Sequence, residues 1–376
     1  MTTPQHRVFG LDLLRAFAVV SVVYAHGYNF LEHYLTPEQY TFGLFEGVNI
    51  FFTLSGFLIG RILLKTVVHE DFGAEMLREF WIRRWFRTLP NYFLVLLVLL
   101  AYYVAIDGVP DHLWKYFVFS QNLVTPHPRF FPEAWSLAVE EWFYLLIPIP
   151  LYLMGQVKRL DRQRTILWTI LAVIVAVTVY RVIRAQSGFE SLGDWDLVMR
   201  KQVFLRFDGL MFGVLGAYLS VFHRHRWEAH QALTMTIGVT LLIADKLLGQ
   251  TGMWWYLNYF TNTITALAVL FMLPRLSTWT RKPDLITKGV TFISVISYSM
   301  YLLNLTVMQN MVYPQIRNIC WSCLPLPGPA MYAVYWVTTI ALSYVLYRCY
   351  EKPMTGLRDK WKPSRRASVE AMTPAR

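Results

Sequence analysis

The sequence predicts an all-α fold, a polytopic membrane helical bundle of about ten transmembrane helices with both termini in the cytoplasm. Three observations predict it. The 376 residues are 55% hydrophobic and only 16% charged, which is more apolar surface than a soluble core of this size can bury. Apolar runs of about 20 residues recur along the chain, and each is long enough to cross a hydrocarbon layer of about 30 Å. The basic residues are also unevenly divided between the intervening segments.

The apolar runs define ten expected spans joined by short polar segments. The first run holds Arg15 and His26 and has no small-residue cleavage site, so we expect a retained helix rather than a signal peptide. Residues 112–124 are too few to cross the hydrocarbon layer, and they include His112 and Lys115. This pattern predicts an amphipathic segment that lies at the surface or re-enters between helices. The ten spans are residues 9–30, 44–64, 89–106, 135–154, 165–183, 204–222, 231–248, 253–274, 290–313 and 329–347.

The charge pattern sets the expected orientation. A net charge of +11 would also suit a nucleic-acid-binding protein, but its distribution follows the positive-inside rule. With a cytoplasmic N-terminus, 25 of the 35 Lys and Arg residues fall in cytoplasmic segments, 6 in the opposite segments and 4 within spans. We therefore expect membrane lipid and no nucleic acid as a partner. Residues 1–350 are expected to form one membrane domain, and residues 351–376 a short basic cytoplasmic tail.

The three cysteines leave two interpretations open. Cys320 and Cys323 lie in an outward segment as Cys-Trp-Ser-Cys, and Cys349 lies on the cytoplasmic side. An oxidising compartment would join the first two in a disulfide, although unpaired packing cysteines fit the sequence as well. Two thiols are too few for a metal site, so no metal is expected.

Arg15 and His26 are ionisable residues inside an apolar span, where such groups are costly. They are 11 residues apart, which at about 100° per residue places them on one helix face and about 16 Å apart along the axis. Arg15 would lie towards the cytoplasm and His26 in the outer half. Their shared face favours a functional pair on one cavity. The alternative is that Arg15 extends to the inner headgroups and His26 bonds a neighbouring helix.

Two further groups of charged residues flank or enter spans. Arg84 and Arg87 are three residues apart, hence neighbours on a helix, and form a forked cationic surface suited to phosphate. An ordinary positive-inside anchor is the alternative. Glu140 and Glu141 point about 100° apart, so only one of them faces a given cavity. A structural ion pair with Arg181 or Arg206 is the competing interpretation for them.

Taken together, these stretches resemble the acyltransferase-3 family of integral membrane acyltransferases over about residues 10–353. Each motif alone is modest, and their order makes the resemblance specific. The motifs are Leu-Asp-Leu-Leu-Arg-Ala-Phe-Ala with the Arg15-to-His26 spacing, Gly-Val-Asn-Ile-Phe-Phe-Thr-Leu-Ser-Gly-Phe-Leu-Ile at 47–59, the Arg84 and Arg87 cluster followed by Pro90, Trp-Ser-Leu-Ala-Val-Glu at 135–140, Ile-Ser-Tyr-Ser-Met-Tyr-Leu at 296–302 and Tyr-Glu-Lys-Pro at 350–353.

The resemblance implies a membrane-embedded O-acyltransferase of a bacterial cytoplasmic (inner) membrane. Its donor substrate would be acyl-CoA, usually acetyl-CoA, entering from the cytoplasm, with no permanently bound cofactor. Its acceptor would be a hydroxyl of a carbohydrate, glycolipid or polysaccharide precursor. The resemblance also implies site residues: His26, Arg15 and Glu140 as catalytic residues, and Arg83, Arg84 and Arg87 as the cluster that holds the donor's phosphates.

Neutral His26 would accept the proton of the acceptor hydroxyl as it attacks the thioester, and an acyl-histidine intermediate is the variant that the sequence leaves open. Asn304 departs from the resemblance, because family members often carry a second histidine there. The competing class is a membrane transporter or flippase that uses Asp208, Lys246 and Glu140 as a relay, although no inverted repeat is apparent. A non-enzymatic sensor, the third class, would not depend on His26.

Overall fold

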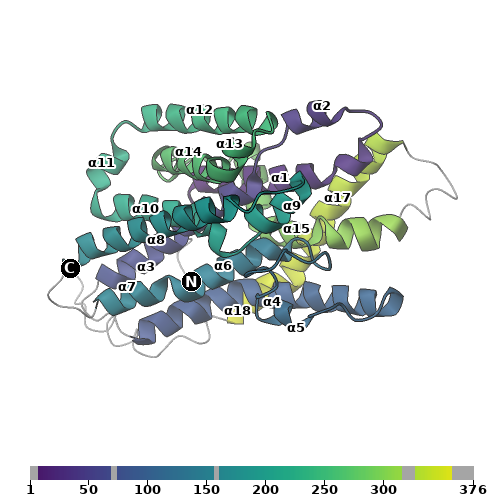
Figure 1. The fold of residues 1–376 in the computed structure, drawn as a ribbon, viewed down its shortest axis with the longest axis horizontal. Coiled ribbons are helices and arrows are strands. Elements are labelled where there is room, and N and C mark those ends of the chain that lie inside the picture. The colour runs from purple at the N-terminus through teal and green to yellow at the C-terminus, as the bar shows by residue number, and fades with distance from the viewer. Residues whose placement is uncertain (1–6, 69–73, 156–160, 316–326, 358–376) are drawn as a thin grey trace.

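The computed structural model describes residues 7–68, 74–155, 161–315 and 327–357, which form helices and no strand (Figure 1). The all-α prediction is confirmed. Nine helices within these ranges are long and apolar enough to cross a membrane. The remaining predicted span, 253–274, is divided between a short helix at Trp254–Tyr259 and the shorter apolar helix α14. The span-forming helices are α1 (Phe9–His26), α3 (Gly47–Val68), α4 (Ala74–Ile106), α6 (Ala134–Leu146) with α7 (Pro148–Gly155), α8 (Arg162–Ala185), α10 (Phe207–Phe222), α12 (Gln231–Gln250), α14 (Thr261–Leu276), α15 (Leu285–Leu303) and α17 (Gly328–Leu346).

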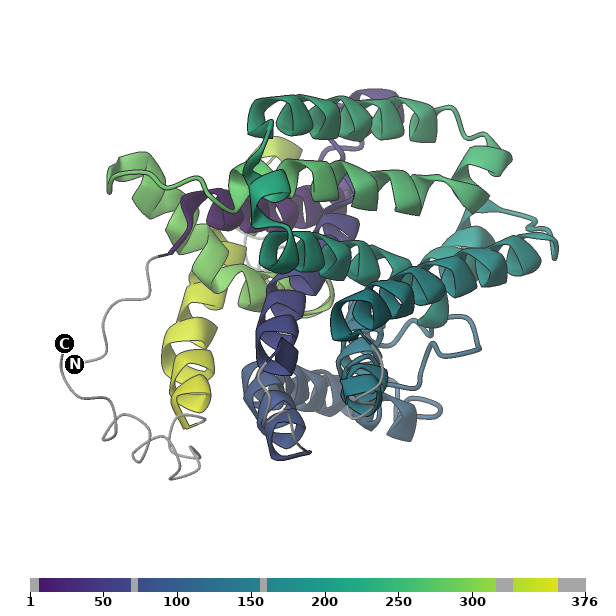
Figure 2. The same cartoon turned by 90° about the vertical axis from the view of Figure 1, so that its left-hand side faces the viewer.

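The arrangement places α1, α3 and α10 inside the bundle. In Figures 1 and 2, α12 lies at one edge beside α14, and α4 runs near the opposite edge. The most extensive helix pairs are α3 with α10, α12 with α14, and α1 with α15. Because α1 and α15 are nearly 260 residues apart in sequence, their contact joins the first helix of the described chain to one of its later helices.

The close crossing of α3 and α10 depends on glycines. A Cβ atom added to Gly56 would lie 1.9 Å from the carbonyl oxygen of Leu210, and one added to Gly213 would lie 2.1 Å from that of Thr53. Neither position has room for a side chain, so the two backbones approach at a distance that only glycine permits. This crossing fixes α3 as one wall of the candidate site.

Two long helices differ from the predicted spans. Helix α4 begins at Ala74, 15 residues before the predicted start of its span, because the arginine-rich stretch before Thr88 continues the same helix. Arginine is a good helix former, and hydropathy marks only the apolar part of such a helix. The span predicted at 290–313 is broken: α15 ends at Leu303, and a π-helical segment, Thr306–Val312, follows after Asn304 and Leu305.

The short elements connect these helices, and some predictions fall outside the described residues. Segment 112–124 contains one short helix, α5, in which Trp114 is exposed and Tyr116 is buried. Cys320, Cys323 and the end of the predicted tail lie outside the described residues. The short elements are α2 (Pro37–Phe42), α5 (Trp114–Phe117), α9 (Leu192–Trp195), α11 (Arg224–Glu228), α13 (Trp254–Tyr259) and α18 (Lys352–Leu357).

Candidate active site

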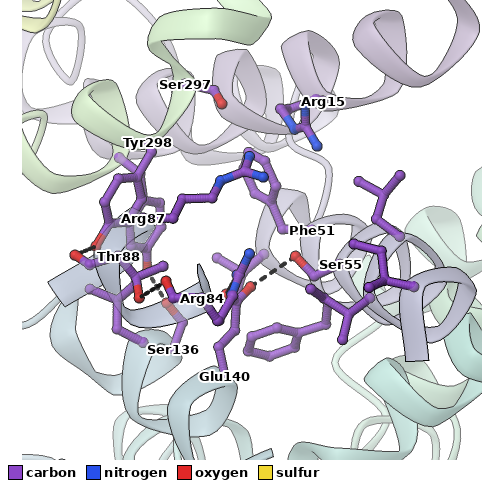
Figure 3. Close-up of a pocket in the computed structure, with 17 residues that line it drawn as sticks. Arg15, Phe51, Ser55, Arg84, Arg87, Thr88, Ser136, Glu140, Ser297 and Tyr298 are labelled. Carbon is purple, nitrogen blue, oxygen red and sulfur yellow. Dashed lines mark hydrogen bonds and ion pairs between the residues drawn. The ribbon is translucent and has the colours of Figure 1, made fainter. Parts of the chain in front are cut away.

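A cavity opens between α1, α3, α4, α6 and α15, and three of the side chains that line it are the arginines Arg15, Arg84 and Arg87 (Figure 3). We call it the arginine cavity. It joins residues that the sequence separates by almost 290 positions, because the central α1–α15 pair forms one side and α4 with α6 the other. Hydroxyl groups and one carboxylate complete the polar lining: Ser55, Thr88, Ser136, Glu140, Ser297, Tyr298 and Tyr301.

Arg84 is held by an ion pair with Glu140 across α4 and α6. Its Nη2 atom donates to Oε2 of Glu140 at 3.1 Å and to the phenolic oxygen of Tyr144 at 2.6 Å. The guanidinium also lies over the Tyr144 ring, 4.1 Å from its centroid. Ser55 donates to the other carboxylate oxygen of Glu140 at 3.1 Å. Both oxygens of Glu140 are therefore occupied, and its charge is matched by Arg84.

Arg87 and Arg15 are much less compensated. Among the described residues, Arg87 has neither a hydrogen-bonded nor an ion-paired partner, and Figure 3 shows its side chain extending across the cavity from α4. The carboxylate nearest to Arg15 is that of Asp12 at 4.0 Å. Asp12 already accepts two hydrogen bonds from Arg7, at 2.8 and 2.9 Å. Since the lining holds three guanidinium groups and one carboxylate, the arginine cavity is electropositive.

Arg83 lies off the cavity. Its guanidinium pairs with Glu79 one helical turn earlier, its side chain is 44% exposed, and it is absent from the cavity lining. Adjacent helix positions point about 100° apart, so Arg83 faces away when Arg84 faces inward. Of the three predicted phosphate-binding arginines, the structure brings Arg84 and Arg87 together with Arg15.

The buried acidic residues take partners that the sequence did not identify. Glu140 faces the cavity and Glu141 turns away from it to accept a hydrogen bond from Thr88 at 2.7 Å, as the 100° offset predicts. The ion pair proposed with Arg181 or Arg206 is not formed by Glu140, whose partner is Arg84. Arg181 instead pairs with Asp208 at 2.5 Å, where both side chains are buried.

His26 lies at the C-terminal end of α1, and Arg15 lies in the N-terminal half of the same helix. His26 is the last residue of the helix, and it does not line the arginine cavity. Its Nδ1 atom lies 2.5 Å from the amide oxygen of Asn304. The amide of Gln309 also donates a hydrogen bond to the His26 carbonyl oxygen. Both partners come from the broken region after α15, where Asn304 contacts the imidazole and Gln309 holds the backbone of His26.

One face of α15 connects the arginine cavity with His26. Ser297 and Tyr301 line the arginine cavity, and Asn304 contacts His26. Positions 297, 301 and 304 are four and three residues apart, so they lie on one stripe of the helix and its end. The stripe leads from the arginines towards the imidazole on a helix that packs against α1, which carries both Arg15 and His26.

Sequence reasoning missed Tyr144 and Ser55, which hold Glu140. Tyr144 is four residues after Glu140 on α6, and this spacing could have identified it as a neighbour. Ser55 comes from α3, and no local pattern connects it with α6. Asn304 was recognised only as a departure from the histidine expected there.

A comparison with protein families identifies the chain. The family model of the acyltransferase-3 family, described as an acyltransferase domain, matches residues 8–348. The chain belongs to the acyltransferase-3 family. The match includes every residue of the arginine cavity as well as His26 and Asn304. No solved structure matches the chain significantly.

Curated relatives of this family member are bacterial. A Staphylococcus aureus (strain COL) protein, provisionally named an O-acetyltransferase, is 26% identical over 94% of this chain and 59% of its own length. The provisionally named peptidoglycan O-acetyltransferase YrhL of Bacillus subtilis (strain 168) is 33% identical over 46% of this chain and 29% of its own. Peptidoglycan O-acetyltransferase OatA of Listeria monocytogenes is 33% identical over 37% of this chain and 23% of its own. The chain thus spans less than two thirds of these relatives.

Proposed function

We propose that this acyltransferase-3 member transfers an acyl group, expected to be acetyl, from acyl-CoA to a hydroxyl of a cell-surface polysaccharide or of its glycolipid precursor. The observation that carries the proposal is the electropositive arginine cavity on the same helix pair that presents His26 and Asn304. The arginine cavity suits a donor that carries several phosphates, and the imidazole of His26 suits proton transfer.

The donor would bind by its phosphates. Arg87 has no partner among the described residues, and Arg15 is 4.0 Å from a carboxylate already bonded to Arg7. Guanidinium groups bind phosphate oxygens through paired, charge-assisted hydrogen bonds. Arg87 is exposed to solvent and Arg15 is partly buried, and neither is held by a carboxylate at hydrogen-bond distance, so both, together with Arg84, would be available to hold a diphosphate.

The acyl end of the donor would reach His26. Arg15 and His26 are 11 residues apart on a continuous helix, which is about 16 Å along the axis. A thin, extended pantetheine arm can bridge such a separation along the α15 stripe. The acceptor oxygen then forms a bond to the thioester carbonyl carbon as the carbon–sulfur bond breaks. The hydroxyl proton passes to Nε2 of His26 and from there to the departing thiolate.

The acceptor class is inferred from relatives. Two of them carry names that specify peptidoglycan O-acetylation, YrhL and OatA. These names make a peptidoglycan hydroxyl the first acceptor to test. Because the similarity covers only part of this chain, other surface glycans should be tested next.

The alternative of a transporter receives little support from the geometry. The three residues that would form its relay are engaged in separate local contacts. Asp208 pairs with Arg181, Glu140 pairs with Arg84, and Lys246 donates to the carbonyl oxygens of Thr41 and Leu44. A proton or ion relay needs groups that can exchange partners along a path, and these contacts do not form one.

The test is transfer of radiolabelled acetyl from acetyl-CoA to purified peptidoglycan or a muramic-acid-containing fragment by the purified full chain in detergent. We expect alkali-labile label in the glycan, and loss of at least about 10²-fold in rate for His26→Ala with acetyl-CoA binding retained. Substitution of His33, which is exposed outside the spans, is the control. Unchanged transfer by His26→Ala would contradict the assigned base.

A further inference from the structure

The break after α15 is stabilised by the side chain of Asn304. Helix α15 ends at Leu303, and the last carbonyl groups of a helix lack partners within it. The Nδ2 group of Asn304 donates to two of these carbonyls, that of Met300 at 2.9 Å and that of Tyr301 at 2.7 Å. Asn304 thus caps the helix with its own amide.

These two bonds determine which way the amide faces. A carbonyl oxygen can only accept, so the atom that meets Met300 and Tyr301 must be the nitrogen, and Oδ1 must point to the other side. On that side it lies 2.5 Å from Nδ1 of His26. The orientation therefore follows from the hydrogen-bond network rather than from a free choice between oxygen and nitrogen.

The same bond determines the tautomer of His26. Because Oδ1 of Asn304 is an acceptor, Nδ1 of His26 must carry the hydrogen. A neutral imidazole has one N–H group, so its Nε2 atom keeps the free lone pair. None of the described carboxylates lies within ion-pair distance of His26, which leaves the neutral imidazole as the form that Asn304 holds.

Glu133 fixes the position of this break. Its carboxylate accepts hydrogen bonds from the Thr306 backbone N–H at 2.6 Å and from the Thr306 hydroxyl group. The Tyr301 hydroxyl donates to the Glu133 carbonyl oxygen at 3.1 Å. Both sides of the break are therefore bonded to the residue that immediately precedes α6. Asn304 and α6, which carries Glu140, form one connected unit.

We infer that Asn304 is a positioning residue that holds His26 as the Nδ1–H tautomer and so directs the basic Nε2 towards the acceptor hydroxyl. The catalytic consequence rests on the proposed function, whereas the tautomer does not. A histidine at position 304 could donate or accept according to its own tautomer. An asparagine whose nitrogen is committed to two carbonyls can only accept.

Nitrogen-15 NMR of histidine-labelled protein in detergent, at about pH 8 where an ordinary imidazole is neutral, tests the tautomer without substrate. The His26 signals are assigned by their loss in His26→Gln. We expect protonated Nδ1 and unprotonated Nε2 in the unmodified protein, and a shift towards the Nε2–H form in Asn304→Ala. The Nε2–H form in the unmodified protein, or an Asn304→Ala spectrum identical to it, overturns the inference.

Two further variants separate positioning from folding. Asn304→Asp keeps an acceptor oxygen towards His26 but removes the donor to the Met300 and Tyr301 carbonyls. It should therefore retain the Nδ1–H tautomer and recover part of the transfer that Asn304→Ala loses by about 10²-fold or more. Asn262→Ala removes another buried amide, one that contacts Asn49, and should leave the His26 signals unchanged. Loss of transfer in both position-304 variants with the tautomer retained overturns the positioning role. A locked tautomer with no transfer by the unmodified protein refutes only the proposed function.

Discussion

Tyr144 donates its phenolic hydrogen to Oε2 of Glu140 at 2.8 Å, and the same oxygen accepts from Arg84. The carboxylate therefore has no free lone pair directed at the cavity from that oxygen, and its other oxygen accepts from Ser55. A carboxylate bound in this way is a poor base. We expect Glu140 to act by holding Arg84 in place for the donor's phosphates.

Replacing Glu140 by Gln should destabilise the protein by about 3 kcal/mol. The side chains of Arg84 and Glu140 are only 11% and 14% exposed, and removing one partner of such a pair leaves a buried charge without compensation. Chemical or thermal denaturation in detergent measures the loss. Glu79→Gln, which breaks the exposed pair with Arg83, is the matched control and should cost less than about 1 kcal/mol. Equal losses in the two variants would contradict this account.

Arg87→Ala should weaken donor binding and leave stability unchanged. Arg87 has no ion-paired or hydrogen-bonded partner in the described part of the chain, so its removal orphans no other group. A charge-assisted hydrogen bond contributes about 1.5–3 kcal/mol, which corresponds to a roughly tenfold or greater rise in the dissociation constant for acetyl-CoA. Calorimetric titration measures it.

Arg83→Ala is the control for this prediction, because it removes the same charge from the neighbouring position but faces away from the cavity. Its affinity for acetyl-CoA should stay within about twofold of the unmodified protein, since exposed charges act weakly through solvent. If Arg83→Ala and Arg87→Ala weaken binding equally, the arginines act as a diffuse basic surface and not as a phosphate site.

Gly56→Ala should disrupt the α3–α10 crossing. The new methyl group would meet the Leu210 carbonyl oxygen at 1.9 Å, so the helices must separate, and overpacking of this kind costs about 1–3 kcal/mol or more. Gly249→Ala in α12 has nothing within 4 Å and should be neutral or stabilising, because alanine is the better helix former. Melting temperatures of the two variants, compared in one detergent, decide between steric contact and a general effect of glycine loss.

The fold was predictable because hydropathy depends on each residue alone. Ten apolar runs gave the helices, including α14, which is shorter than the others. The break at Asn304 was not predictable, since the run 290–313 contains no charged residue, glycine or proline and the break depends on Glu133, a residue more than 170 positions away.

The site was predictable where it depends on helical spacing within one segment. Helical spacing alone placed Arg84 and Arg87 together and separated Glu140 from Glu141. Spacing could not indicate that Glu140 pairs with Arg84 instead of Arg181, because that choice depends on how α4 and α6 pack. Nor could it show that Asn304 would contact His26, since the two residues meet only through the α1–α15 pair.

Glu133 should make stability depend on pH. Burial raises the pKa of this carboxyl group, which lies outside the predicted spans, from 4.5 to about 7. Between these values the folded protein holds a proton that the unfolded chain releases, so the free energy of unfolding should fall as pH rises from about 4.5 to about 7 and level off above. Each pKa unit is about 1.4 kcal/mol, which gives a decrease of a few kcal/mol in the free energy of unfolding.

Glu133→Gln keeps an acceptor for Thr306 but cannot titrate, so its denaturation midpoint should change less between about pH 5 and about pH 8. Parallel pH profiles for the two proteins would show that another group is responsible.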